Sequence, residues 1–256
     1  MVDTLSPVAA GRVLRRVELL RDDFATPDAG AFAAAAGRRI LLIRRRAKRI
    51  VFELDGGVRF FAHLGMTGRF AVATAGDELL PHTHVRFDLG DVELRQIDPR
   101  RFGGLHWLGT DTGEDNLGPE PLAIRAAELA RRLAGTRRAV KAALLDQTLI
   151  AGLGNIYVDE ALHGAGLHPT VLCCDIDRPA VGRLSRSIKT TLRRAIDAGG
   201  SSIRDYVDAE GKGGSFQTMH KVYGREGQRC RKCRATIERI VLGQRSTHFC
   251  PRCQAL

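Results

Sequence analysis

Four cysteines near the C-terminus form two Cys-x2-Cys pairs, Cys230 with Cys233 and Cys250 with Cys253, with sixteen residues between the pairs. Tetrahedral zinc is held by four thiolates at about 2.3 Å, and two such pairs on a hairpin commonly supply them. Four unrelated core cysteines or two disulfides are the alternatives. A hairpin of this size buries too little apolar surface to fold without a metal. The spacing therefore predicts one structural Zn²⁺, with Arg245 built into its hairpin.

A second chemically suggestive segment is the glycine-rich turn Gly152-Leu153-Gly154-Asn155, which precedes a predicted helix. The first backbone N–H groups of a helix are unpaired and attract anions, and Asn155 is suited to cap them. Basic side chains precede this turn on a predicted helix, at Arg137, Arg138 and Lys141. The combination favours a helix-turn-helix-like element that grips phosphate, and an ordinary interhelical turn is the alternative.

Two further turns place apolar side chains beside positive charge. His63 to Gly68 carries Met66 between glycines, and Asp98 to Gly103 carries Arg100 together with Phe102. Such side chains usually serve packing. A protein that flips a base, however, must fill the vacated stack with apolar groups and pair the orphaned base with a donor-rich side chain. These turns are therefore candidates for that role.

Composition indicates the partner. The chain has 256 residues, 40 Lys plus Arg against 29 Asp plus Glu, a net charge of +11 and 44% hydrophobic residues. A polyanion is the leading partner for such a globular chain, although an arginine-rich solvated surface would give the same balance. The length predicts two domains plus the zinc segment. We find no export signal or membrane-length apolar stretch, so we expect reduced thiols, no membrane and a cytoplasmic location.

The elements that position these residues change in type along the chain. Short runs rich in β-branched and aromatic residues predict strands in the first part, and helical periodicity begins after the acidic stretch 111–121. The predicted strands are 39–44, 49–54, 58–64 and 92–97, and the predicted helices are 128–133, 137–146, 155–165 and 179–198. The fold class is therefore α+β and multidomain. We expect an antiparallel β-sandwich at 1–108, a linker at 109–122, a helical DNA-binding domain at 123–222 and a zinc finger at 223–256.

From about residue 5 onward the chain resembles the formamidopyrimidine-DNA glycosylases, bacterial enzymes in a family shared with endonuclease VIII. The motifs that carry the resemblance are Arg46-Ala47-Lys48, His63-Leu64-Gly65-Met66-Thr67-Gly68, Asp98-Pro99-Arg100-Arg101-Phe102-Gly103, Asn116-Leu117-Gly118-Pro119-Glu120-Pro121-Leu122, Gly152-Leu153-Gly154-Asn155-Ile156-Tyr157, Val222-Tyr223-Gly224-Arg225 and Gln244-Arg245-Ser246-Thr247. Together they are highly specific. The resemblance implies a helix-two-turn-helix element and a monomer that acts on double-stranded DNA containing oxidised bases or abasic sites.

The resemblance also implies roles for individual residues. Met66, Arg100 and Phe102 would fill the space left by a flipped nucleotide, and Lys48 would donate protons during strand cleavage and lesion release. Arg245 would take part in the second elimination, and Glu160 would lie near the catalytic centre. Phosphates around the lesion would be held by His82, Arg101, Arg137, Lys141, Asn155 and Arg245. The segment from Ser201 to Arg225 would form a loop that closes over an everted purine.

In this family an amine attacks the sugar C1′, expels the damaged base and forms a Schiff base, after which β- and δ-elimination cut the strand. The family's amine belongs to an N-terminal proline followed by a glutamate. The present sequence begins Met1-Val2-Asp3 and its first proline is Pro7. We therefore expect Met1 to be an internal methionine of a longer reading frame, and the chain as printed to bind lesions without forming a trappable Schiff base.

Four functions are compatible with these motifs. The first is a bifunctional glycosylase for oxidised purines such as 8-oxoguanine and formamidopyrimidines. The others are a lesion-binding protein of the same fold without a nucleophile, an endonuclease VIII-like enzyme for oxidised pyrimidines, and a plain zinc-ribbon nucleic-acid binder. The zinc-ribbon binder leaves the loops of Met66 and Phe102 without a purpose. The arginine and phenylalanine after Asp98-Pro99, together with the long loop, favour the purine enzyme.

Overall fold

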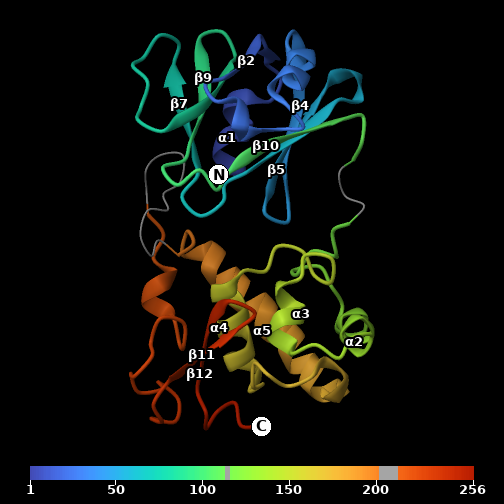
Figure 1. Ribbon diagram of the computed structural model, residues 1–256, viewed down its shortest axis with the longest axis vertical. Coiled ribbons are helices and arrows are strands. Elements are labelled where there is room, and N and C mark those ends of the chain that lie inside the picture. The colour runs from blue at the N-terminus through green and yellow to red at the C-terminus, as the bar shows by residue number, and fades with distance from the viewer. Residues whose placement is uncertain (113–115, 202–212) are drawn as a thin grey trace. The chain divides into compact units, whose positions relative to one another are not determined.

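A computed structural model describes residues 1–112, 116–201 and 213–256 (Figure 1). The chain divides into two compact units. The first holds residues 1–112, and the second holds residues 116–201 and 215–256. Residues 202–212, which belong to the expected closing loop, and residues 113–115 of the expected linker lie outside the described part. Among the described residues, no helix is long and apolar enough to span a bilayer.

The first unit is a β-sandwich with a short helix, α1 (Val2–Ala9), packed against strand β4. One sheet has the order β1-β4-β5-β6-β10-β3, and the other has the order β2-β8-β9-β7. Pairing is antiparallel except between β10 and β3. The strands are β1 (Val13–Leu14), β2 (Arg16–Leu19), β3 (Ala25–Thr26), β4 (Arg38–Arg46), β5 (Arg49–Leu54), β6 (Arg59–His63), β7 (Arg69–Thr74), β8 (Thr83–Asp88), β9 (Val92–Ile97) and β10 (Gly104–Gly109).

The sandwich core is built from phenylalanine rings contributed by both sheets. Phe52, Phe60 and Phe87 stack on one another with interplanar angles of 7 to 10°, and Phe70 packs against this group. All four rings are buried. Aromatic pairs of this kind add about 0.5–1.5 kcal/mol beyond the area they bury. The core therefore gives the first unit a rigid base for its connecting loops.

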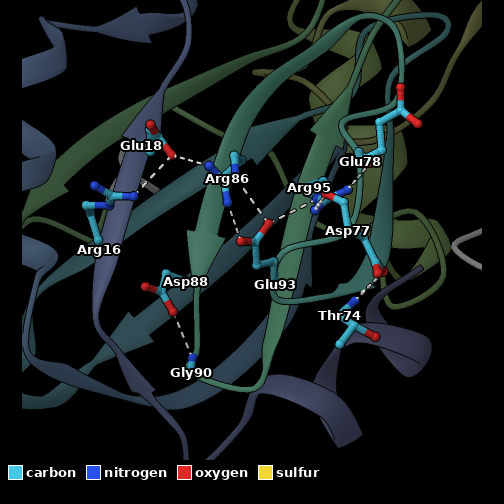
Figure 2. A network of polar contacts seen from close by, with 10 residues as sticks. All are labelled: Arg16, Glu18, Thr74, Asp77, Glu78, Arg86, Asp88, Gly90, Glu93 and Arg95. Atoms are coloured by element: carbon cyan, nitrogen blue, oxygen red, sulfur yellow. Dashed lines mark hydrogen bonds and ion pairs between the residues drawn. The ribbon is translucent and has the colours of Figure 1, made fainter.

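A polar network on the second sheet fixes the loop between β7 and β8 (Figure 2). Arg95 is 1% exposed and donates to Glu93 and to the carbonyl oxygens of Asp77 and Glu78. Arg86 also donates to Glu93. Hydrogen bonds from Arg86, aided by Arg95, hold the pKa of the Glu93 carboxyl below its ordinary value despite its burial. A buried charge with all its partners in place specifies one loop conformation, and this loop leads to His82.

The second unit is a helical bundle whose core lies between α4 and α5. Its helices are α2 (Ala126–Ala134), α3 (Val140–Leu145), α4 (Asn155–Ala165) and α5 (Arg178–Asp197). The two long helices approach closely because α4 has Gly164 at the contact. A Cβ atom there would lie 2.3 Å from Ser187 Oγ. The Asp177 side chain caps α5 by accepting from Ala180 N, and Gly166 ends α4 in a left-handed conformation.

The C-terminal segment forms a two-stranded hairpin, β11 (Glu238–Leu242) and β12 (Arg245–Phe249). The turn residues Gly243 and Gln244 both have positive φ, at 51° and 61°. Positive φ at both central positions matches the right-handed twist of a tight hairpin. Arg245 directly follows this turn.

Most of the predicted elements are present, with informative differences. Strands β5 and β9 and helix α4 match their predicted bounds, but β7, β8 and β10 lay in segments without a predicted strand. Helix α3 begins at Val140, so Arg137 and Arg138 precede the helix and do not lie on it. Ile196, near the C-terminal end of α5, is 63% exposed.

Candidate DNA interface and zinc centre

In the first unit, the buried carboxylate of Asp98 joins the two loops singled out from the sequence. Its Oδ1 accepts a hydrogen bond from Thr67 Oγ1 in the loop between β6 and β7. The same carboxylate accepts from the backbone N–H groups of Arg100, at 3.3 Å, and Gly103, at 2.7 Å, in its own loop. Asp98 is 0% exposed. Because one charge serves donors from both loops, each loop holds the conformation of the other.

The two loops also touch through their backbones. Gly65 has φ +58°, and a Cβ atom at this position would lie 2.5 Å from the carbonyl carbon of Phe102. Gly103 is similarly close, because its Cβ would lie 2.9 Å from the carbonyl oxygen of His63. Only glycine permits this approach. Gly65, which precedes Met66, and Gly103, which follows Phe102, therefore serve the contact between the loops.

These loops present apolar side chains to solvent. Met66 is 62% exposed and Phe102 is 51% exposed, whereas the other phenylalanines of this unit are buried. The guanidinium carbon of Arg100 lies 4.8 Å from the centroid of the Phe102 ring. Exposed large apolar groups on a rigid support indicate a binding surface. Other expected DNA contacts of this unit are also exposed, at Lys48 in the turn between β4 and β5, His82 before β8, and Arg101.

In the second unit, the four cysteine sulfur atoms lie within 4.8 Å of one another. Cys233 and Cys250 are 3.4 Å apart, and Cys230 and Cys253 are 3.9 Å apart. A zinc tetrahedron with sulfur at about 2.3 Å has an edge of about 3.8 Å. The donor set and its spacing therefore fit one structural Zn²⁺. Gln254 supports the centre, because its side chain accepts from Cys250 N and donates to Leu167 O.

Hydrogen bonds from helices α3 and α4 hold strand β12 in place next to Arg245. The Asp159 carboxylate accepts from Lys141 Nζ at 2.6 Å and from His248 N at 2.9 Å. Lys141 Nζ also donates to the carbonyl oxygen of Ser246, and Asn155 Nδ2 donates to the same oxygen, each at 2.9 Å. Arg245 itself is exposed. Three bonds from α3 and α4 thus fix Ser246 and His248, which lie one and three residues after Arg245.

This geometry corrects one expected contact and one expected cap. Lys141 is 0% exposed and paired with Asp159, so its ammonium group is not available to a phosphate. Burial lowers the pKa of Lys141, and the Asp159 carboxylate opposes this effect by favouring the charged form. The N-cap of α4 is Gly154, and Asn155 is the first helical residue. Lys141 was expected to hold phosphate, and its ammonium group is instead engaged by Asp159, a partner that sequence alone did not reveal.

Glu160 is the expected acidic residue of α4, and it is 3% exposed. Its carboxylate accepts hydrogen bonds of 2.9 to 3.0 Å from the backbone N–H groups of Lys221, Val222 and Tyr223. A carboxylate bound by three amides is a strong anchor for a chain segment. Arg137 remains exposed, consistent with a contact to an external anion.

Models of the formamidopyrimidine-DNA glycosylase N-terminal domain and H2TH domain match residues 1–105 and 117–207, respectively. A third model, described as a zinc finger found in FPG and IleRS, matches residues 227–256. The formamidopyrimidine-DNA glycosylase of Bacillus subtilis is 42% identical over 98% of this chain and 95% of the relative. This chain belongs to the formamidopyrimidine-DNA glycosylase family.

Solved structures of the family agree with this assignment. A Thermus thermophilus member is similar with a TM-score of 0.88 and 40% identity, over 99% of this chain and 95% of that chain. A Lactococcus lactis member, solved with DNA containing an abasic site, has a TM-score of 0.91 and 33% identity, over 100% and 97%. The chain is therefore a base-excision-repair DNA glycosylase of a glycosylase and AP lyase family, with DNA as its partner and one structural zinc. The expected family, fold class and zinc are confirmed.

Two acidic residues with a large structural role were not among the expected site residues. Asp98 lay in a recognised motif, but no role was given to it. Asp159 lies next to Glu160, and two adjacent acids on one turn of helix α4 are a usable signal. A carboxylate that is buried at such a position needs partners.

Proposed function

We propose that this glycosylase removes oxidised purines from duplex DNA, including 8-oxoguanine and formamidopyrimidines, and then cleaves at the resulting abasic site by β- and δ-elimination. The observation that carries the proposal is the pair of exposed apolar side chains, Met66 and Phe102, on two loops joined by Asp98. Solved Lactococcus lactis relatives were bound to DNA containing Fapy-dG or an abasic site, which supports the same substrate class here.

In the first unit, Met66 and Phe102 enter the stack that the flipped nucleotide leaves. Arg100 donates hydrogen bonds to the orphaned base, and its contact with the Phe102 ring presets its direction. Preset side chains lose little conformational freedom on binding, which favours the flipped state. Lys48 donates protons to the leaving groups, and His82 and Arg101 hold phosphates on either side of the lesion.

In the second unit, Arg137, Asn155 and Arg245 hold the strand that carries the lesion. Asn155 has one amide hydrogen engaged with Ser246 O and a second available for a phosphate oxygen. Arg245 assists the second elimination from a hairpin fixed by Asp159 and Lys141. Glu160 acts as a positioning residue, because its carboxylate is occupied by the amides of residues 221–223. Cys230, Cys233, Cys250 and Cys253 hold the zinc that folds the hairpin.

We further propose that the protein acts as a monomer on DNA in the bacterial cytoplasm. Each of its two units has its own hydrophobic core, so folding does not require a second copy. Relatives of this chain are bacterial proteins named formamidopyrimidine-DNA glycosylase.

The test compares excision from matched duplexes that contain either 8-oxoguanine or an oxidised pyrimidine, using protein with its native N-terminus. We expect preferential release of 8-oxoguanine and strand products that end in phosphate on both sides of the lost nucleoside. Borohydride should trap the protein on the 8-oxoguanine duplex. Faster excision of the pyrimidine would contradict the substrate class, and release of the base without strand cleavage would contradict the elimination steps.

A further inference from the structure

A basic hollow on the second unit is lined by side chains that are not among the expected phosphate contacts. Its volume is about 330 Å³. Helix α5 forms one wall with Arg186, Thr190 and Arg194, which lie on one face of the helix because they are spaced by four residues. Gly164 of α4 and the residues Phe216, Met219 and Lys221 complete the lining, together with Glu160. Glu160 was expected near the catalytic centre, and residues 216–221 belong to the segment expected to close over an everted purine.

The hollow concentrates positive charge, and Glu160 is the one acidic residue in its lining. It is lined by Arg183, Arg186, Arg194 and Lys221, and an adjoining hollow adds Arg231 and Lys232. In the part of the chain that the structure describes, none of these six side chains forms an ion pair. The Glu160 carboxylate offsets one of these charges, and its hydrogen-bonding capacity is engaged by three backbone amides, so it is not an ion-pair partner of the arginines. Clustered like charges repel, and a bound anion removes that repulsion.

The hydrogen-bonding groups of the hollow match a phosphate ligand. Arg186 and Arg194 offer planar donor pairs, Lys221 offers a point charge, and Thr190 adds a hydroxyl group. The Arg183 side chain already donates to Ala165 O, so it contributes mainly charge. Met219, which is 40% exposed, supplies an apolar surface at the wall. A hollow of this size exceeds what one phosphate group fills, since small-molecule sites begin at about 300 Å³.

We propose that this hollow binds an oligophosphate group, either free, as in a nucleoside triphosphate, or as consecutive phosphates of a nucleic-acid strand. Binding at this hollow does not depend on which base the enzyme removes. Because Lys221 belongs to the segment that Glu160 anchors, a ligand here would also stabilise residues 216–223.

The test is calorimetric titration of the full chain with inorganic tripolyphosphate and with ATP, both at low ionic strength. The informative variant is Arg186→Gln with Arg194→Gln. Its matched control is Arg193→Gln, which removes an exposed charge of the same helix that does not line the hollow. We expect the double variant to weaken tripolyphosphate binding by about tenfold or more, since each bond to a charged group contributes appreciably. The control should change binding by less than about twofold, the effect of one screened surface charge.

Thermal melting provides a second readout. Tripolyphosphate should raise the melting temperature of the parent protein and the control, and should leave that of the double variant unchanged. Without ligand, all three should melt alike because the substituted arginines are exposed. Equal loss of binding in the control and the double variant, or no binding by the parent protein, would overturn the proposal.

A competition arm distinguishes the two phosphate sources. If the natural ligand is a DNA strand, a long lesion duplex displaces tripolyphosphate, and the double variant binds that duplex more weakly than a short one. If the ligand is a free oligophosphate, lesion duplex and tripolyphosphate bind together. Either result supports the oligophosphate site and assigns its source.

Discussion

Lys141 Nζ donates a hydrogen bond of 2.9 Å to the carbonyl oxygen of Ser246, the residue that follows Arg245. The two residues are 105 positions apart in the sequence. This bond makes Lys141 part of the support for the zinc hairpin. Together with Asp159 and Asn155, Lys141 connects helices α3 and α4 to the hairpin that carries Arg245.

We predict that the salt dependence of DNA binding distinguishes the buried pair of Lys141 and Asp159 from a residue that contacts phosphate. Arg137→Ala should lower the slope of log K against log salt for duplex DNA by about one unit, because one phosphate contact is lost. Lys141→Met with Asp159→Asn should leave the slope unchanged, because Lys141 does not reach phosphate. Anisotropy titrations across a salt series measure both. A slope reduced by the double variant would restore Lys141 as a phosphate ligand.

The single substitution Lys141→Met should lower the stability of the protein more than the double substitution does. Lys141→Met leaves the Asp159 charge buried without its partner, so we expect the free energy of unfolding to fall by about 3–5 kcal/mol. Adding Asp159→Asn should recover a large part of this loss, since the second charge is removed while an acceptor for His248 N remains. Urea unfolding of the three proteins gives these values. A single variant as stable as the parent would mean that the pair is exposed in solution.

The hydrogen bond between Thr67 and Asp98, which connects the two loops, predicts a defect in binding to damaged DNA alone. Thr67→Val removes the hydroxyl that bonds Asp98, and should weaken binding to a duplex with an abasic-site analogue by about tenfold, equivalent to a loss of about 1–1.5 kcal/mol. Thr67→Ser keeps the hydroxyl and is the control. Undamaged duplex should bind all three proteins alike, because the loops act only after flipping. If Thr67→Val weakened binding to both duplexes equally, the hydrogen bond between the loops would serve general folding.

Loss of zinc should unfold the hairpin and spare the rest. Structural zinc contributes on the order of 10 kcal/mol to the segment it folds, whereas each larger unit has its own core. We expect Cys230→Ser with Cys233→Ser to abolish zinc binding and DNA binding while most helical circular dichroism remains. Cys174→Ser, which replaces an exposed cysteine outside the cluster, should change neither. Unchanged DNA affinity in the double variant would contradict a role for the hairpin.

The turn before α4 predicts an acid-sensitive step. Hydrogen bonds from Thr148 and Arg138 lower the pKa of Asp146 from 3.8 to about 2. A depressed carboxyl pKa contributes stability that is fully present above pH 3.8 and is lost as the pH falls through about 2. This contribution is about 2 kcal/mol. Between pH 5 and pH 2, Asp146→Asn should therefore lose less stability than the parent protein in urea unfolding. An identical pH dependence would contradict the assigned bonds.

The sequence predicted what depends on local pattern. The zinc ligands follow from spacing, and α4 has its predicted bounds because glycines mark both of its ends. The missed features depend on pairing between distant segments. Asp98 meets Thr67 across 31 positions and Asp159 meets His248 across 89. Nothing in the local sequence distinguishes a buried Lys141 from a phosphate-binding one, because burial depends on where β12 packs. Strands β7, β8 and β10 were not predicted, because pairing with neighbouring strands defines them more than their own sequence patterns do.

If the loops joined by Asp98 recognise a flipped nucleotide, this shows most directly in the ratio of the protein's affinities for lesion duplex and undamaged duplex. We would measure it by anisotropy for the parent protein, Arg100→Ala and Arg137→Ala. Arg100→Ala should lower the ratio by about tenfold or more, because a bond made only after flipping is lost. Arg137→Ala should weaken binding to both duplexes and leave the ratio unchanged. If the two variants weakened both duplexes equally, Arg100 would be an ordinary phosphate contact and the account would be contradicted.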